Sequence, residues 1–183
     1  MCDISIIEEL KFLERYNQHF NEFLLRFDRF KQIRSQYEIT KDKKLLTDFR
    51  CYIDILIVQI RSFCLENDIN NKKNYTVQHF LNLFSSEESA KNLDNFLEKP
   101  LYGTKDDGYC SIKQAIKFVS DKYICHHDKL SEVGISQIDF IIAELVNPYS
   151  KINLDIIINE LSKYILETQI NLKRHLLEIS RTK

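Results

Sequence analysis

The sequence contains very little glycine and proline: three glycines and two prolines in 183 residues. An all-β domain needs a turn roughly every 8–12 residues, and glycine, proline and asparagine form most such turns. Asparagine is present here but is concentrated in a few clusters. The composition therefore predicts few and long secondary-structure elements. With three glycines, a glycine-rich loop that cradles a nucleotide phosphate is also excluded.

The sequence also lacks a charge excess and long hydrophobic runs. Its formal net charge is −1, so no global charge attracts it to nucleic acid or membrane. The longest apolar runs, Ile55–Val58 and Phe140–Ala143, fall far short of the roughly 20 residues that a membrane helix needs. Asp3, Glu8 and Glu9 stand where a secretory signal would carry a basic region. We therefore expect no membrane span and a cytoplasmic location.

Cysteine patterns that hold metals or disulfides are missing as well. The number of cysteines is odd, and no two form a C-x-x-C pair; they are Cys2, Cys51, Cys64, Cys110 and Cys125. Scattered cysteines of this kind are typical of reduced, mostly buried side chains. There is no H-E-x-x-H or G-x-S-x-G motif either. We therefore expect no metal and no cofactor.

What the sequence does contain is helical periodicity. Apolar residues recur at spacings of three, four or seven from Ile6 to Phe30, which predicts a helix over roughly residues 4–37. A second long helix is predicted from Asp42 to about Asn67, with an apolar stripe broad enough for a central position. A third begins after Asn153, which can cap it, and ends in a basic segment that suits the negative end of a helix dipole.

Shorter helices are predicted between the long ones. Thr76 can cap a helix that ends at Phe84, and Ser85 with Glu88 has capping-box spacing for the next helix. Ser111 with Gln114 has the same spacing. Gly103 to Gly108 reads as a loop, and a further helix is expected over about residues 136–146. The prediction is an all-α bundle of about seven helices, three of them long, forming one domain over residues 1–183.

One segment carries residues suited to acid–base chemistry. His126, His127 and Asp128 stand together where a predicted helix ends, and Lys122 lies four residues before His126. Histidine exchanges protons near neutral pH, and a carboxylate can orient it. Lys122 could supply a cation for a phosphate. The same residues also suit a polar helix end that satisfies backbone carbonyls, and the sequence leaves both interpretations open.

The segment resembles the motif of the HEPN superfamily, and in particular the branch named after an abortive-infection protein of phage defence. That branch follows the outline Arg-Asp-Lys-x-x-Ala-His-x-Asp. Here Asp121, Lys122, His126 and Asp128 fit the outline, with Cys125 at the small-residue position. The likeness covers about residues 45–130, including the long helix with Arg61, and fades towards both ends.

The resemblance implies a helical bundle that forms homodimers and, in active members, a metal-independent endoribonuclease of toxin–antitoxin or phage-defence systems. RNA would be the substrate, and an antitoxin or another protein a partner. His126 would transfer the proton at the ribose 2′-hydroxyl, and Asp128 or His127 would orient it. Lys122, or Arg61 from another helix, would meet the phosphate.

The sequence departs from the pattern at the arginine that stabilises the phosphate in the family. Val119, Ser120 and Asp121 occupy the three positions that could hold it, with Ser120 at the usual one. Serine lacks the charged planar fork that binds phosphate through two hydrogen bonds. We therefore expect weakened or lost catalysis. The alternatives are a helical module that binds protein or RNA without cutting it, and a small helical regulator with no nucleic-acid role.

Two weaker candidates remain. Basic residues from Arg26 to Arg34 could contact RNA phosphates, but interspersed acidic residues favour a solvated helix face. A zinc site from His126, His127 and either His79 or Cys125 is disfavoured, because adjacent histidines point to different sides of a helix.

Overall fold

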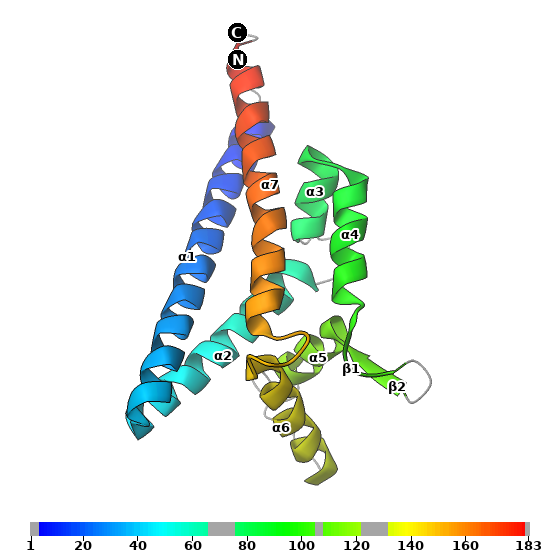
Figure 1. Cartoon of the computed structure of the whole chain (residues 1–183). Coiled ribbons are helices and arrows are strands. Elements are labelled where there is room, and N and C mark those ends of the chain that lie inside the picture. The colour runs from blue at the N-terminus through cyan, green and yellow to red at the C-terminus, as the bar shows by residue number, and fades with distance from the viewer. Residues whose placement is uncertain (1–3, 66–75, 105–107, 122–131, 182–183) are drawn as a thin grey trace. The chain divides into compact units, whose positions relative to one another are not determined.

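The computed structural model describes residues 4–65, 76–104, 108–121 and 132–181 (Figure 1). The described part contains seven helices, of which α1 (Ile4–Thr40), α2 (Lys43–Cys64) and α7 (Leu154–Arg181) are long, and one two-stranded sheet. The predicted all-α class and the predicted number of long helices are confirmed. None of the helices among these residues combines the length and the apolar character that a bilayer span requires. The chain divides into two compact units, Met1–Leu56 and Ile57–Lys183.

The first unit is a helical hairpin of α1 and the beginning of α2. Lys41 ends α1 in the left-handed region, at φ 54°, with its amide donating to the Tyr37 carbonyl over 2.9 Å. Glycine is usual at such a position. Asp42 then caps α2 by accepting the Lys44 amide at 2.9 Å. The rings of Phe30 and Phe49 stack with centroids 5.1 Å apart and hold the two helices together.

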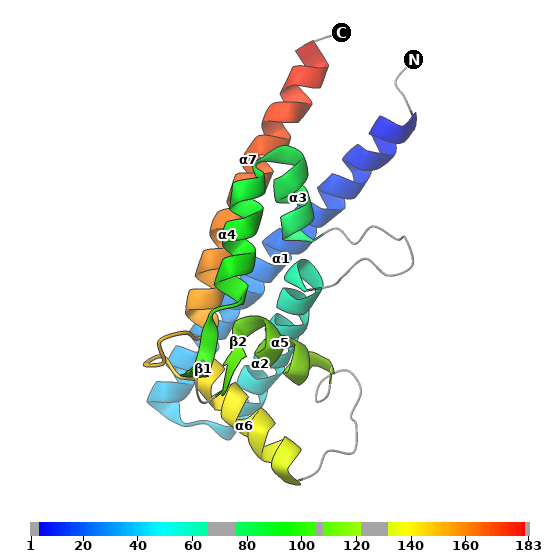
Figure 2. The ribbon, with the colours of Figure 1, turned by 90° about the vertical axis from the view of Figure 1, so that its right-hand side faces the viewer.

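In the second unit α3 (Val77–Phe84) and α4 (Glu87–Leu97) pack against each other and along α7 (Figures 1 and 2). Thr76 caps α3, as predicted, by accepting the His79 amide. The cap of α4 is Ser86, which accepts the Ser89 amide at 3.0 Å, so the capping box predicted at Ser85 was placed one residue early.

Polar contacts tie these helices together within a buried core. Glu167 on α7 accepts hydrogen bonds from the hydroxyls of Ser85 and Ser89, the latter over 2.8 Å. The Gln78 amide nitrogen donates to the Cys64 carbonyl at the end of α2, over 3.0 Å. The apolar side chains that fill the space between the helices are almost fully buried: Val77, Phe80, Leu81, Leu93, Leu97, Ile157, Ile158, Leu161 and Ile165.

A β-hairpin lies where the sequence predicted only a loop. Strands β1 (Pro100–Thr104) and β2 (Gly108–Ser111) pair antiparallel, with Tyr102 opposite Cys110. The strands are too short to give a recognisable alternation. They pack against α5 (Ile112–Phe118), which follows β2 directly (Figure 2).

The caps of α5 and α7 follow the prediction, whereas the start of α6 (Glu132–Val146) does not. Ser111 and Gln114 form the predicted capping box, with Gln114 N donating to Ser111 Oγ over 3.2 Å and Ser111 N donating to Gln114 Oε1 over 3.0 Å. Residues 119–121 continue α5 as a π-helical turn. Helix α6 begins about four residues earlier than expected. Asn153 caps α7 by accepting the Ile156 amide at 3.1 Å, as predicted.

Candidate functional site

Two of the predicted site residues, Ser120 and Arg61, are described by the structure. Lys122, His126, His127 and Asp128 lie outside the described residues, so their predicted roles stay predictions. The described part of the candidate site consists of the π-helical turn at the end of α5 and the elements that pack beside this turn.

Arg61 comes to this turn from the last turn of α2. Its Nη2 atom lies 2.7 Å from Oδ1 of Asp121, and the two side chains are only 29% and 24% exposed. An arginine side chain keeps its charge at every physiological pH. Because Asp121 directly follows Ser120, the ion pair places a permanent cation beside the position where the resemblance expects an arginine.

Ser120 itself has no exposed surface, and neither does Val119 before it. Both continue the buried side of α5, to which Ile112 and Ile116 also belong. In this arrangement the Ser120 hydroxyl does not reach the surface where a large substrate would lie. The expectation that Ser120 contacts substrate therefore gains no support, and Arg61 becomes the stronger candidate for the phosphate contact.

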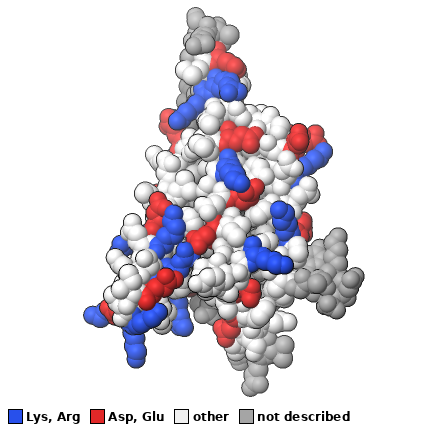
Figure 3. All heavy atoms as spheres, in the orientation of Figure 1, with Lys and Arg blue, Asp and Glu red and all other residues white. Residues whose placement is uncertain are grey.

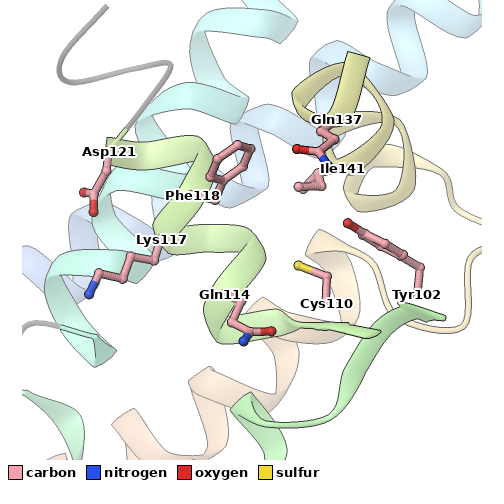
Figure 4. Close-up of a pocket in the computed structure, with 8 residues that line it drawn as sticks. All are labelled: Tyr102, Cys110, Gln114, Lys117, Phe118, Asp121, Gln137 and Ile141. Carbon is pink, nitrogen blue, oxygen red and sulfur yellow. The ribbon is translucent and has the colours of Figure 1, made fainter. Parts of the chain in front are cut away.

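An open cavity of about 510 Å³ adjoins Asp121 and is lined by residues of α5, α6 and the β-hairpin (Figure 4). Four of its residues come from one face of α5, because positions separated by three, four and seven residues share a side of a helix. Gln137 and Ile141 lie one turn apart on α6, and Tyr102 and Cys110 are cross-strand partners in the hairpin. The lining residues are Gln114, Lys117, Phe118, Asp121, Gln137, Ile141, Tyr102 and Cys110.

The hairpin wall of the cavity is held in place by aromatic and sulfur contacts. The Tyr102 ring meets Phe140 of α6 edge to face, with centroids 5.0 Å apart at 87°. Cys110 lies opposite Tyr102 in the sheet, and its thiol donates to the Ser111 carbonyl over 3.7 Å. Burial raises the pKa of the Cys110 thiol above its ordinary value, and the nearby Tyr102 hydroxyl offsets this only in part. Cys110 is thus a protonated wall residue at neutral pH and a poor nucleophile.

Sequence analysis missed most of this cavity. The face of α5 could have been found from the spacing of Gln114, Lys117, Phe118 and Asp121. The walls formed by the β-hairpin and α6 could not have been found in this way. The hairpin was predicted as a loop, and no local sequence pattern places α6 beside it. Within the described ranges, no group of three or more histidine, cysteine or acidic side chains could hold a metal ion.

Surface charge is mixed rather than gathered. On the face in Figure 3, basic and acidic side chains alternate without an extended patch of one sign. In the basic stretch of α1, Arg26 pairs with Glu22 at 3.2 Å and Lys31 pairs with Asp28 at 2.8 Å, as on a solvated helix face.

No protein-family model, curated protein or solved structure matches this chain. The HEPN resemblance rests on the residues of the motif and on the helical pattern around it.

Proposed function

We propose that this chain is a HEPN-like protein that acts on RNA, as a weak metal-independent endoribonuclease in which Arg61 replaces the missing arginine of the motif. The observation that carries the proposal is the Arg61–Asp121 ion pair of 2.7 Å. It supports the idea that α2 supplies the phosphate-binding cation that Ser120 cannot provide.

The proposed reaction needs only groups that the chain contains and water. His126 takes the proton of a ribose 2′-hydroxyl, and the oxygen forms a bond to the adjacent phosphorus. The bond from phosphorus to the 5′ oxygen breaks, and the leaving oxygen takes a proton from water. The hydroxide that remains takes the proton from His126, which restores water and the neutral histidine. The products are a 2′,3′-cyclic phosphate and a 5′-hydroxyl. Arg61 stabilises the negative charge that grows on the phosphate oxygens.

Asp121 explains why this activity is expected to be weak. Its carboxylate lies on the same guanidinium that would receive the phosphate. A substrate phosphate must therefore compete with a carboxylate that is already in place and partly buried. Removing the charge of Asp121 should free Arg61 for RNA, whereas removing Arg61 should remove the cation altogether.

The test is cleavage of end-labelled RNA by the purified protein in EDTA, with RNA affinity measured beside it. His126→Ala should abolish cleavage, and Arg61→Ala should lower the rate by a factor on the order of a hundred. Asp121→Asn should tighten RNA binding. Lys113→Ala and Glu98→Gln are the matched controls, since they break an ion pair of the same unit at 3.0 Å without touching Arg61. Equal rates for Arg61→Ala and the controls would sink the proposal.

A non-catalytic interaction module is the second candidate. Two observations favour it: Ser120 is buried at the arginine position, and Arg61 is already ion-paired. Tight RNA or protein binding by the wild type with no cleavage would establish this function instead. Homodimerisation, an antitoxin partner and a phage-defence setting rest on the resemblance alone. Sedimentation that shows only the 21.9 kDa species at micromolar concentration would count against a shared cleft.

A further inference from the structure

We propose that the cavity beside Asp121 binds one unstacked base of single-stranded RNA, next to the phosphate that Arg61 meets. The inference rests on the proposed function and names the part of the substrate that the site selects. It depends on the chemistry of the cavity walls, which comes from three different elements of the second unit.

The size and shape of the cavity suit a small planar group. About 510 Å³ lies within the range of roughly 300–1,000 Å³ that is usual for small-molecule sites. In Figure 4 the side chains of Phe118, Tyr102, Gln137 and Ile141 surround a common space. Phe118 comes from α5 and Tyr102 from β1, so two aromatic rings stand on different walls. Aromatic rings of this kind are the usual stacking partners of unpaired bases.

Two carboxamides give the cavity polar groups that match the edge of a base. A glutamine offers a donor and an acceptor in one plane, the pattern that pairs with a nucleobase edge. Gln114 is held in one orientation because its Oε1 accepts the Ser111 amide at 3.0 Å, so Nε2 is the group it can donate. Gln137 on α6 can both donate and accept. A purely apolar ligand would offer neither carboxamide a hydrogen-bond partner.

The charged side of the cavity suits the backbone of the same nucleotide. Lys117 on α5 and Asp121 in the turn that continues it also line the cavity, at the left in Figure 4, whereas Tyr102 lies at the right. Lys117 is exposed, and Arg61 is paired with Asp121. We infer that the phosphate of a base held between the rings lies toward Lys117 and the Arg61–Asp121 ion pair. A base inside a duplex cannot enter such a cavity, so the site selects unpaired nucleotides.

The experiment compares binding of short homopolymeric single strands with binding of an abasic strand of equal length, by fluorescence anisotropy in EDTA. Wild-type protein should bind at least one base-containing strand on the order of tenfold more tightly than the abasic strand. Phe118→Leu and Gln137→Ala should remove this difference and leave abasic binding unchanged. Asn95→Ala, an exposed amide on α4, is the matched control. Thermal unfolding checks that each variant is folded.

The outcomes separate this inference from the proposed function. Equal binding of abasic and base-containing strands by the wild type would overturn the base site while leaving RNA binding intact. If the wild type binds no RNA, the proposed function fails, and nucleoside 5′-monophosphates then test the cavity alone by saturation-transfer NMR. A signal that Phe118→Leu abolishes would uphold the base site, and no signal would overturn it.

Discussion

The guanidinium of Arg61 lies 2.7 Å from the carboxylate of Asp121 and joins the last turn of α2 to the π-helical end of α5. The two residues are 60 positions apart in the sequence, so no local pattern relates them. Their contact bears on the proposal that this segment is a HEPN-like motif without its arginine. The cation absent from the motif itself is present beside it, on another helix, and is held there by the residue that follows Ser120.

Ser120→Arg would introduce the arginine of the motif that this segment resembles, and we expect it to destabilise the protein rather than activate it. Ser120 is fully buried, and a guanidinium forced into that position is overpacked and lacks a partner. We expect a loss of about 2–4 kcal/mol in the free energy of unfolding, or a Tm lower by about 5–15 °C. Thermal unfolding by circular dichroism measures this. Ser120→Ala is the control and should cost far less. A stable and active Ser120→Arg variant would mean that the turn rearranges.

Ser111→Ala should weaken the start of α5 and with it the placement of the cavity wall. The substitution removes the hydroxyl that accepts the Gln114 amide over 3.2 Å. Loss of a cap costs about 0.5–2 kcal/mol, which lowers Tm by about 1–8 °C in a chain of this size. Ser136→Ala is the matched control, because Ser136 is exposed inside α6 and alanine favours helices there. Equal Tm values for the two variants would show that the Ser111 cap does not contribute to stability.

Glu167→Ala should loosen the turn between α3 and α4 from α7. Glu167 accepts hydrogen bonds from both Ser85 and Ser89, so its removal leaves two hydroxyls without their partner. We expect a cost of about 1–3 kcal/mol, and faster hydrogen exchange in α3 and α4. Glu160→Ala removes an ion pair on the same helix with Lys163, whose side chain is 70% exposed, and should cost less than about 1 kcal/mol. Unchanged exchange in Glu167→Ala would contradict the role of this contact.

Asp54→Asn should stabilise the protein at neutral pH. Burial raises the pKa of the Asp54 carboxyl above 3.8, and the nearby Arg50 offsets this only in part. A carboxyl whose pKa is raised by folding contributes its stability below the unfolded pKa and loses it as the pH rises through the folded pKa. Asparagine does not ionise, so the free energy of unfolding of Asp54→Asn should exceed that of the wild type at pH 7. This difference should vanish below about pH 3.8. Chemical unfolding at both pH values measures it. Arg50→Ala should shift stability in the opposite direction at pH 7.

Much of the fold follows from local sequence signals. The spacing of apolar residues predicted the three long helices, and Thr76, Ser111 and Asn153 cap the helices that were expected to follow them. These signals act within one or two helical turns, because a capping side chain accepts a hydrogen bond from a backbone amide only two or three residues later. The cap at Ser86 was missed because three serines lie close together and two of them offer similar spacing. The strands of the hairpin were missed because each has at most five residues.

The sequence by itself determined the helical class, the positions of most helix ends and the cluster of His126, His127 and Asp128, since these depend on residues close together in the chain. Only the tertiary structure decided that Arg61 pairs with Asp121, that Ser120 is buried, and that Tyr102 and Gln137 line one cavity with Phe118. Contacts between residues far apart depend on how whole apolar faces pack. That packing is a property of many side chains together and of no single motif.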